Sequence, residues 1–296
     1  MASLATSGLS LPKHLAAGVW QKAQRGSTVA ALSGAEPFQF GETQLMTFTT
    51  PPKAEYVAEG ANKSPSDVAF GTKTVTPHKV QVTTRFNQEV QWADEDYQLA
   101  VLSTISDALG VALSRALDLG VYHAINPLTG TSVASITEKI TDTTNTVADS
   151  GDPDLDIEDA VGQVISAGFR PTGLALDPAY AWKIATVRYD DGRKKYPEIG
   201  LTTDISSFEG FRVSVSDTVS GQPEVTGGTG VEGIVGDFAQ LRWGVQRNIG
   251  LERITYGDPD GQGDLKRKNQ IALRAEVVYG WAIMDLDAFA TINAGS

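Results

Sequence analysis

The chain has 296 residues, of which 41% are hydrophobic and 20% charged, and it contains no cysteine. This composition predicts a folded protein with a substantial core, and it excludes disulfides, thiolate metal sites and a cysteine nucleophile. With 24 Lys and Arg against 36 Asp and Glu, the formal net charge is -12, which argues against a surface built to clamp nucleic acid phosphates.

Residues 1–45 are small, polar and interrupted by glycine, and their few apolar side chains follow neither a period of 2 nor one of 3.6. We expect an extended N-terminal arm. The arm lacks the basic start and apolar run of a secretory signal, and the longest apolar run of the chain, residues 277–284, is far shorter than the roughly 20 residues that span a bilayer. We therefore expect an intracellular chain with no membrane association.

Two β-rich stretches, residues 45–50 and 78–92, enclose the segment TTPPKAEYVAEGANKSPSDVAF, residues 49–70. The enclosed segment contains three prolines, Gly60 and five charged residues, a composition that resists both a helix and a core of its own. We predict that residues 46–80 form an extended hairpin loop.

A long helix is predicted over residues 94–124. Asp94 is a suitable N-cap, apolar residues recur at helical spacing from Leu102 to Leu117, and Pro127 follows the end. Gly120 lies inside this helix and weakens it, so we expect bending or close packing there.

The second half predicts a mixture of helices and strands. One helix is expected over residues 156–168, with Asp156 as N-cap and Gly168 after its end, and another over residues 177–187, with Asp177 as N-cap and Pro178 in the first turn. Strands are expected at residues 172–177, 211–217, 233–238, 241–254, 270–285 and 288–292.

Catalytic chemistry is not evident. His14, His78 and His123 are far apart in the sequence, and the chain has no G-x-S-x-G, H-E-x-x-H or Walker motif. The segment DPDGQGD, residues 258–264, could gather oxygen ligands for a divalent cation, but it lacks the distal Glu of an EF-hand. We predict that the protein is not an enzyme and has no catalytic residue, cofactor or metal.

The order of arm, hairpin, long helix, α/β region and returning β run resembles the major capsid proteins of tailed bacteriophages with the HK97 fold. In that family the hairpin tends to carry an aromatic residue, then EG, then a turn rich in Ser and Pro, and AEYVAEGANKSPSD is similar. The segments LALDPAYAWKIATVRYDDGR, FEGFRVSVSD and IVGDFAQLRWGVQRNIGLERI follow the order of the family's central domain, and RKNQIALRAEVVYGWAIMDLDAFATI looks like its last strands.

The resemblance implies an α+β, HK97-like capsid fold. Its parts would be an N-terminal arm (1–45), an extended hairpin or E-loop (46–80), a peripheral domain with a spine helix and a long sheet (81–130 and 238–296), and an axial domain (131–237). It also implies a structural protein that self-assembles into the icosahedral shell around the double-stranded DNA genome of a tailed phage.

Two sets of intersubunit contacts are expected from the resemblance. The hairpin would lie on a neighbouring subunit through Lys53, Glu55, Tyr56, Glu59 and Lys63. The loop at residues 257–269 would lie at local three-fold axes, where acidic residues of one copy face basic residues of the next; these are Asp258, Asp260 and Asp264, and Lys266, Arg267 and Lys268.

The expected partners are other copies of the chain, as pentamers and hexamers, and a portal protein. Because the chain begins almost directly with the arm, a separate scaffold or none is expected, and a decoration protein is a further candidate. The DNA would be enclosed without specific binding, in a virion assembled in the host cytoplasm. Three alternatives stay open: an encapsulin-like compartment of the same fold, a hydrolase or transferase on an α/β domain, and an adhesion module that would be a stable monomer.

Overall fold

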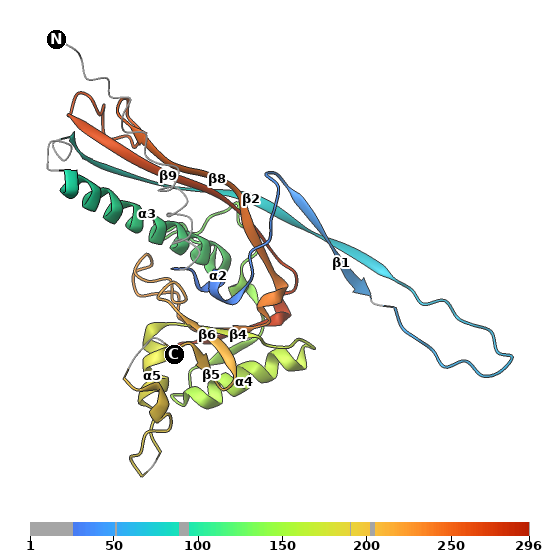
Figure 1. Cartoon of the computed structure of the whole chain (residues 1–296). Helices are drawn as coiled ribbons and strands as arrows, with labels where there is room; N and C mark the ends of the chain where they lie inside the picture. Colours follow the sequence, from blue (N-terminus) through green and yellow to red (C-terminus); the bar gives the residue numbers. More distant parts are fainter. Residues whose placement is uncertain (1–25, 51, 89–94, 190, 202–204, 296) are drawn as a thin grey trace.

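Two β-sheets and their helices make up the part of the chain that this computed structural model describes, which comprises residues 26–50, 52–88, 95–189, 191–201 and 205–295 (Figure 1). A four-stranded sheet has the order β1-β2-β9-β8, and a six-stranded sheet has the order β3-β10-β7-β4-β6-β5. The predicted α+β class is confirmed. Most of the predicted arm and the predicted cap Asp94 lie outside the described residues.

The four-stranded sheet is antiparallel throughout and consists of β1 (Thr43–Thr50), β2 (Ala69–Asn87), β8 (Leu241–Ile254) and β9 (Gln270–Ile283). The prediction for β8 is confirmed at both ends. β2 begins nine residues earlier than predicted, because its first part pairs with β1, up to Thr43 opposite Val75, and its second part pairs with β9. β1 and the first part of β2 project from the body as one hairpin (Figure 1).

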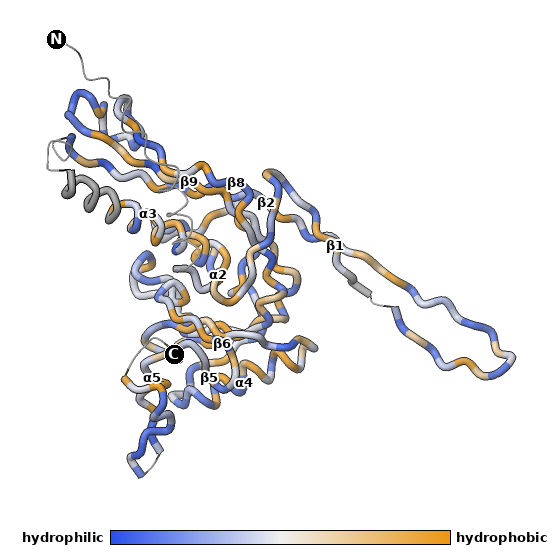
Figure 2. Tube along the Cα trace, in the orientation of Figure 1, coloured by the Kyte–Doolittle hydropathy of each residue, from blue (hydrophilic) through white to orange (hydrophobic). Residues whose placement is uncertain are grey.

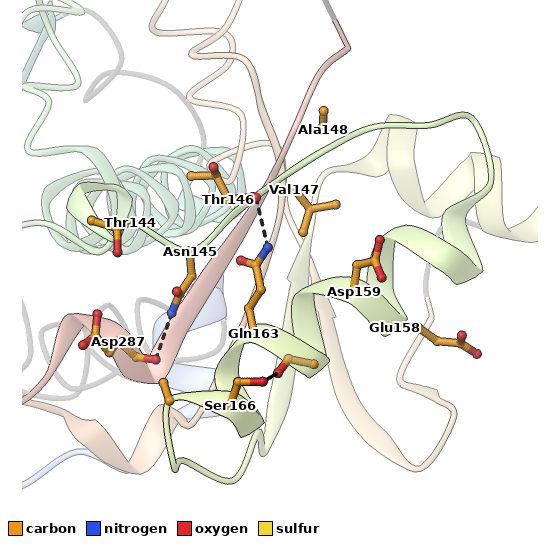
Figure 3. A pocket seen from close by; sticks show the side chains of 12 residues that line it. Thr144, Asn145, Thr146, Val147, Ala148, Glu158, Asp159, Gln163, Ser166 and Asp287 are labelled. Carbon is orange, nitrogen blue, oxygen red and sulfur yellow. Dashed lines mark hydrogen bonds between the residues drawn. The ribbon is translucent and has the colours of Figure 1, made fainter.

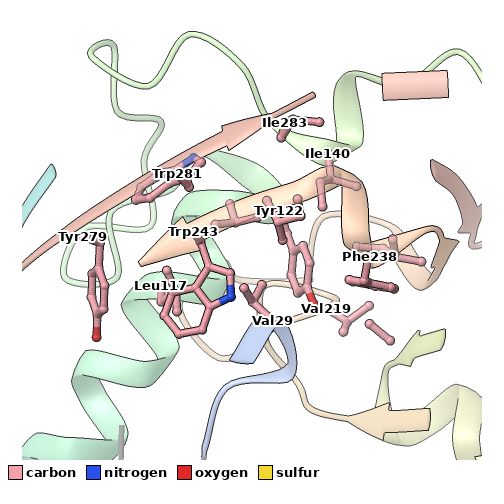
Figure 4. Close-up of a cluster of buried hydrophobic side chains, with 14 of the residues drawn as sticks. Val29, Leu117, Tyr122, Ile140, Val219, Phe238, Trp243, Tyr279, Trp281 and Ile283 are labelled. Atoms are coloured by element: carbon pink, nitrogen blue, oxygen red, sulfur yellow. The ribbon is translucent and has the colours of Figure 1, made fainter. Parts of the chain in front are cut away.

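Helix α3 (Glu95–His123) lies along one face of the long sheet, and the predicted helix is confirmed. Every second residue of β9, from Leu273 to Ile283, belongs to the buried cluster that also contains Leu113 and Leu117 of α3 (Figure 4). The predicted close packing at Gly120 is confirmed, since a Cβ there would lie only 3.0 Å from Cη2 of Trp281. On the opposite face of β9, Arg274 and Glu276 are partly exposed, whereas Val278 and Ala282 are buried.

The six-stranded sheet is smaller and mixed, with β3 (Thr146–Ala148), β4 (Gly173–Leu176), β5 (Ser207–Phe208), β6 (Phe211–Val215), β7 (Val231–Gly236) and β10 (Phe289–Asn293). Helices α4 (Pro153–Ser166) and α5 (Pro178–Thr186) pack on one of its faces, in a second buried cluster with Leu174, Val235 and Ile292. The short helix α2 (Thr28–Leu32) lies on the other face, since Val29 shares the first cluster with Ala175 and Ile234.

The start of α4 corrects a prediction. The N-cap is Asp152, whose side chain accepts a hydrogen bond from Asp154 N at 3.2 Å, and not Asp156. The Asp-Pro pair at 152–153 is the same start signal as the confirmed pair at 177–178. Asp156 is instead buried in the first turn, where its carboxylate accepts a bond from Ser150 Oγ at 2.7 Å.

The last strand belongs to the six-stranded sheet. We grouped residues 238–296 with the long sheet, but β10 pairs with β7 and β3 in the six-stranded sheet. The reason is burial: Ala290 and Ile292 face α4 while Phe289 contributes to the first cluster, so both faces of β10 are covered. Within the described ranges, no helix combines the length and the apolar character that crossing a membrane requires.

Candidate assembly surfaces

The outer part of the hairpin, residues 52–68, is exposed along its whole length and pairs with no strand. Its turn is closed by a bond from Ala61 N to Ala58 O at 3.0 Å, with Gly60 at φ 79°, the value that a type II turn requires at its third residue. Two more bonds link its arms, Ser64 N to Glu55 Oε1 at 2.6 Å and Lys53 N to Ser66 Oγ at 2.7 Å. Hydrophilic and hydrophobic residues alternate along it without a continuous apolar stripe (Figure 2).

The five hairpin residues that we predicted as contacts all lie on this outer part, and all are exposed: Lys53, Glu55, Tyr56, Glu59 and Lys63. Tyr56 is fully exposed, and the neighbouring Val57 is 40% exposed. Fixing the backbone of a residue in one conformation costs about 1–2 kcal/mol. Within the described chain, this segment buries almost no surface that could offset this cost. The exposed Tyr and Val are therefore suited to burial on another surface.

The base of the hairpin is attached to the body. Lys73 Nζ on β2 lies 2.6 Å from Glu138 Oε1, and the His78 ring packs on Trp281 with 4.3 Å between ring centroids. Burial lowers the pKa of His78, so its ring is neutral in this contact at neutral pH. These contacts hold the direction of β2 as it leaves the long sheet.

The loop between β8 and β9 is organised by Arg85 of β2. The Arg85 guanidinium donates to Asp260 Oδ2 at 3.0 Å, to Gly263 O at 2.9 Å and to Gln270 Oε1 at 3.1 Å, and it also pairs with Asp258. The hydrogen bond from Arg85 lowers the pKa of Asp260. Arg85 therefore forms ion pairs with two carboxylates of this loop.

Asp258 and Asp260 thus face a cation of their own chain, which differs from the arrangement that we predicted for the loop. The other four predicted residues, Asp264, Lys266, Arg267 and Lys268, are exposed around the buried Leu265. Asp264 accepts from Arg267 N at 2.9 Å, and the Lys268 ammonium bonds to Gln262 O. Lys266 and Arg267 form no side-chain ion pair with any described residue, so their charges are available to a partner.

The carboxylates of this loop do not form a metal site in the described structure. Arg85 occupies Asp258 and Asp260, and the described residues include no group of three or more His, Asp or Glu side chains placed to hold a metal ion.

A buried junction that the sequence analysis missed joins the two halves of the molecule at α3. Asp118 is fully buried and accepts bonds from Ser27 Oγ, from Thr28 N at 2.9 Å and Oγ1 at 2.8 Å, from Val29 N at 3.2 Å, and from Thr218 Oγ1 at 2.9 Å. Burial raises the pKa of Asp118, while these donors act in the opposite direction. An Asp among buried apolar positions of a helix was the available signal.

Two further residues of α3 hold the same region. Arg115 pairs with Glu224 at 2.6 Å and with Asp217, in the segment between β6 and β7. His123 Nε2 lies 2.8 Å from Val219 O and must donate, because a carbonyl only accepts. Three side chains of one helix therefore fix the position of residues 217–224, and with them the orientation of the second sheet. His14, the third histidine of the sequence, lies outside the described residues.

A family model described as the phage capsid family matches residues 7–294 of the chain. A solved structure from Mycobacterium phage Ogopogo is 52% identical, with a TM-score of 0.83 over 91% of this chain and 92% of that chain. A structure from Gordonia phage Cozz is 32% identical, with a TM-score of 0.79 over 91% of this chain and 87% of that chain.

A third solved structure, titled as the capsid of an empty GTA particle, shares only the fold: it is 13% identical, with a TM-score of 0.62 over 92% of this chain and 90% of that chain. A search of curated proteins finds no match to the sequence.

Proposed function

Because this chain belongs to the phage capsid family, it is a structural protein of the virion that forms the capsid shell from copies of itself, and we propose that this shell encloses the double-stranded DNA genome of a tailed phage. The chain is not an enzyme, so the hydrolase and transferase alternatives are set aside. We further propose that pentamers and hexamers are the units of the shell, and that it is assembled in the host cytoplasm.

The two sheets are the basis for the proposed domains. The long sheet with α3 is the peripheral domain, residues 81–130 and 238–288, and the six-stranded sheet with α4 and α5 is the axial domain, residues 131–237 together with β10. A portal protein at one vertex and a separate scaffold or decoration protein are the other proposed partners. The proposed DNA contact is non-specific, in keeping with the net charge of -12.

The observation that carries the assembly proposal is the outer hairpin, which is exposed throughout and buries nothing within its own chain. On a neighbouring copy, its main-chain groups, Tyr56 and the charged residues around Tyr56 gain partners that the monomer does not provide. The loop at residues 257–269 is the second proposed contact, at local three-fold axes. There Lys266, Arg267 and Asp264 would face another copy, while Asp258 and Asp260 act indirectly by holding the loop on Arg85.

Deletion of residues 53–67 tests the hairpin contact. The shortened chain should fold, as judged by circular dichroism and thermal unfolding, but should form few or no closed particles, because the deleted residues contribute nothing to either buried cluster. Tyr56→Ser should weaken assembly in the same direction, whereas the control Leu128→Ser, at a residue 92% exposed elsewhere, should not. Normal, equally heat-resistant particles from the deletion would contradict the proposal.

A further inference from the structure

Two open cavities at the surface of the described chain differ in the ionisable groups that line them. The larger one, of about 870 Å³, lies between β3 and α4 and is lined by Glu158, Asp159 and Asp287, without a histidine (Figure 3). The smaller one, of about 520 Å³, lies at the base of the hairpin, between β2, residues 136–142 and the end of β9, and His78 lines it. We call it the hinge cavity. Histidine is the only side chain whose ordinary pKa places its change of charge between pH 5 and 8, so pH in this range acts on the hinge cavity.

The hairpin meets the body of the molecule next to His78. Val75 is the last residue of β2 that lies opposite β1, and Thr76 is the first that lies opposite β9. β2 is therefore part of the hairpin up to Val75 and part of the long sheet from Thr76 onwards. His78 lies two residues beyond this change of partner, so the contacts of its side chain help to fix the direction in which the hairpin leaves the sheet.

The half-buried ring of His78 packs on Trp281 of β9. The two ring centroids are 4.3 Å apart, and Nε2 of His78 lies 2.9 Å from Oγ1 of Thr76. Trp281 belongs to the buried cluster between the long sheet and α3 (Figure 4), and α3 approaches it with Gly120, where a Cβ would lie 3.0 Å from Cη2 of the indole. Neither Trp281 nor Gly120 carries a charge. The indole thus contacts both α3 and the base of the hairpin, and the imidazole of His78 makes the second of these contacts.

The charged groups that line the hinge cavity together with His78 already have partners. Lys73 Nζ lies 2.6 Å from Glu138 Oε1, and Asp142 Oδ1 lies 3.8 Å from Lys139 Nζ. A protonated imidazole would therefore find no unpaired carboxylate among the residues that line the cavity. The positive charge that His78 gains in acid is thus not compensated while the ring stays on Trp281.

Burial makes the packed ring of His78 a weaker base than a ring in water, because the charged form loses hydration. It lowers the pKa of His78 below the ordinary value of 6.5. The adjacent Lys79 pairs with Glu276 at 2.8 Å on the other face of the sheet, since successive residues of a strand face opposite sides. As the pH falls below 6.5, protonation therefore favours the state in which the ring has left Trp281 and reached water.

Two other attachments of the hairpin base contain no histidine. Gly41, which precedes β1, donates from its N to Gln246 Oε1 at 3.2 Å and accepts at its O from Gln246 Nε2 at 3.0 Å. Lys73 and Glu138 form the second attachment, an ion pair between β2 and the segment after α3. Protonation of His78 should therefore act on the β2 side of the hairpin base and leave the hairpin attached at Gly41.

We propose that the contact between His78 and Trp281 is a pH-sensitive hinge at the base of the hairpin. Neutral His78 holds β2 on the long sheet, and protonated His78 leaves Trp281 and loosens the first residues that β2 pairs with β9. The role of this hinge rests on the proposed function, because a loosened base changes the direction in which the hairpin reaches a neighbouring copy. The hinge itself lies within one subunit and is measured there.

Hydrogen exchange of the full chain at pH 7.5 and pH 5 tests the hinge, with each rate corrected for the intrinsic effect of pH and the state of assembly matched by light scattering. Residues 74–80 should lose protection at pH 5 by at least about threefold, with a limit of about tenfold for each unit by which the pKa of His78 lies below 6.5. An NMR titration of the unassembled subunit measures that pKa. Residues 271–275 in the core of β9 should stay protected, which distinguishes the hinge from global unfolding.

Two substitutions separate this contact from other effects of pH. His78→Phe keeps an aromatic ring on Trp281 but cannot be protonated, so residues 74–80 should be equally protected at both pH values. His78→Lys is charged at both pH values, so their protection should be low at both. The matched control His123→Gln removes the titration of another histidine and should keep the response of the wild type.

Equal protection of residues 74–80 at the two pH values in the wild type would overturn the inference, and so would a wild-type response in His78→Phe. Because the exchange is measured within one subunit, neither result bears on the formation of a shell. The deletion of residues 53–67 tests that proposal separately.

Discussion

Asp118 is a single residue that holds three segments of the chain together: α3, the start of α2 and the segment after β6. Its carboxylate is fully buried, and each of its donors would lose an acceptor if the side chain were removed. A buried donor left without a partner costs about 1–3 kcal/mol. The junction is therefore expected to contribute more to stability than any exposed ion pair of the molecule.

Asp118→Ala should lower the free energy of unfolding of the subunit by roughly 3 kcal/mol or more. The free energy of unfolding of Asp118→Asn should lie between those of Asp118→Ala and the wild type, because the amide oxygen of Asn still accepts some of the hydrogen bonds. Urea unfolding midpoints provide the measurement, with Glu252→Ala as the control at an exposed acid on β8. Stability of Asp118→Ala within 0.5 kcal/mol of the control, roughly the scatter of surface substitutions, would count against the junction.

His123 makes the stability of the same region depend on pH. Burial lowers the pKa of His123 to about 4 in the folded chain, from an ordinary value of 6.5. Below pH 6.5 the unfolded chain therefore binds a proton that the folded chain does not accept until about pH 4. The contribution of His123 to the free energy of unfolding is therefore complete above pH 6.5. It decreases as the pH is lowered towards 4, by roughly 3 kcal/mol in total.

His123→Gln should keep a donor near Val219 O but remove this titration. The loss of unfolding free energy between pH 7 and pH 4.5, measured by urea denaturation, should then be smaller in the variant than in the wild type by roughly 2–3 kcal/mol. Identical pH profiles for the two proteins would show that His123 is not held neutral by the fold.

The elements of this molecule differ in how far the sequence alone predicts them. The course of the hairpin and the end of α3 follow from local composition and spacing, and β8 was predicted at both ends. The start of α4 was misplaced because two acidic residues near it are both suitable caps, and only the Asp-Pro pair distinguishes them. Local signals therefore locate elements well when they agree.

Contacts between distant residues were not predictable in the same way. Asp260 lies 175 residues from Arg85, and Thr218 lies 100 residues from Asp118. No local pattern in the sequence specifies which carboxylate pairs with which arginine. Likewise, β10 lies in the second sheet because both of its faces are buried there by other elements. The sequence thus identified the residues of the loop at 257–269, but not the arginine that holds its acidic half.

Arg85 should determine the order of that loop. Arg85→Met keeps the length of the side chain but removes its bonds to Asp258, Asp260 and Gly263. Hydrogen exchange at residues 258–264 should become faster in the variant, while the core of β9 stays protected. The control is Arg193→Met, at an arginine 79% exposed in the segment after α5. Unchanged exchange in Arg85→Met would contradict the assignment.

The whole molecule combines an acidic net charge with exposed cations at the surfaces that we assign to assembly. Lys266 and Arg267 are exposed and unpaired by any described carboxylate, although acids outnumber bases in the chain by 36 to 24. Exposed pairs contribute about 0–1 kcal/mol each, but a shell repeats each pair many times. Small contacts between subunits can therefore determine whether the shell closes.

Reversing Lys266 and Arg267 to Glu should prevent assembly at low salt, or make it strongly dependent on ionic strength. The subunit itself should remain as stable as the wild type, because neither side chain is buried. The control is Arg170→Glu, at another exposed arginine, which should assemble normally. Light scattering over a series of salt concentrations measures the yield of assembled particles. If the double variant assembles like the control at low salt, the loop is an ordinary surface.

Whether the chain forms a shell of this kind can be decided by electron microscopy of the expressed chain, with the nucleic acid content of the particles measured in parallel. We expect closed shells with five-fold and six-fold clusters of subunits, in which each hairpin lies on an adjacent copy and no nucleic acid is bound specifically. A stable monomer at concentrations where its relatives form particles, or shells in which the hairpin contacts nothing, would contradict it.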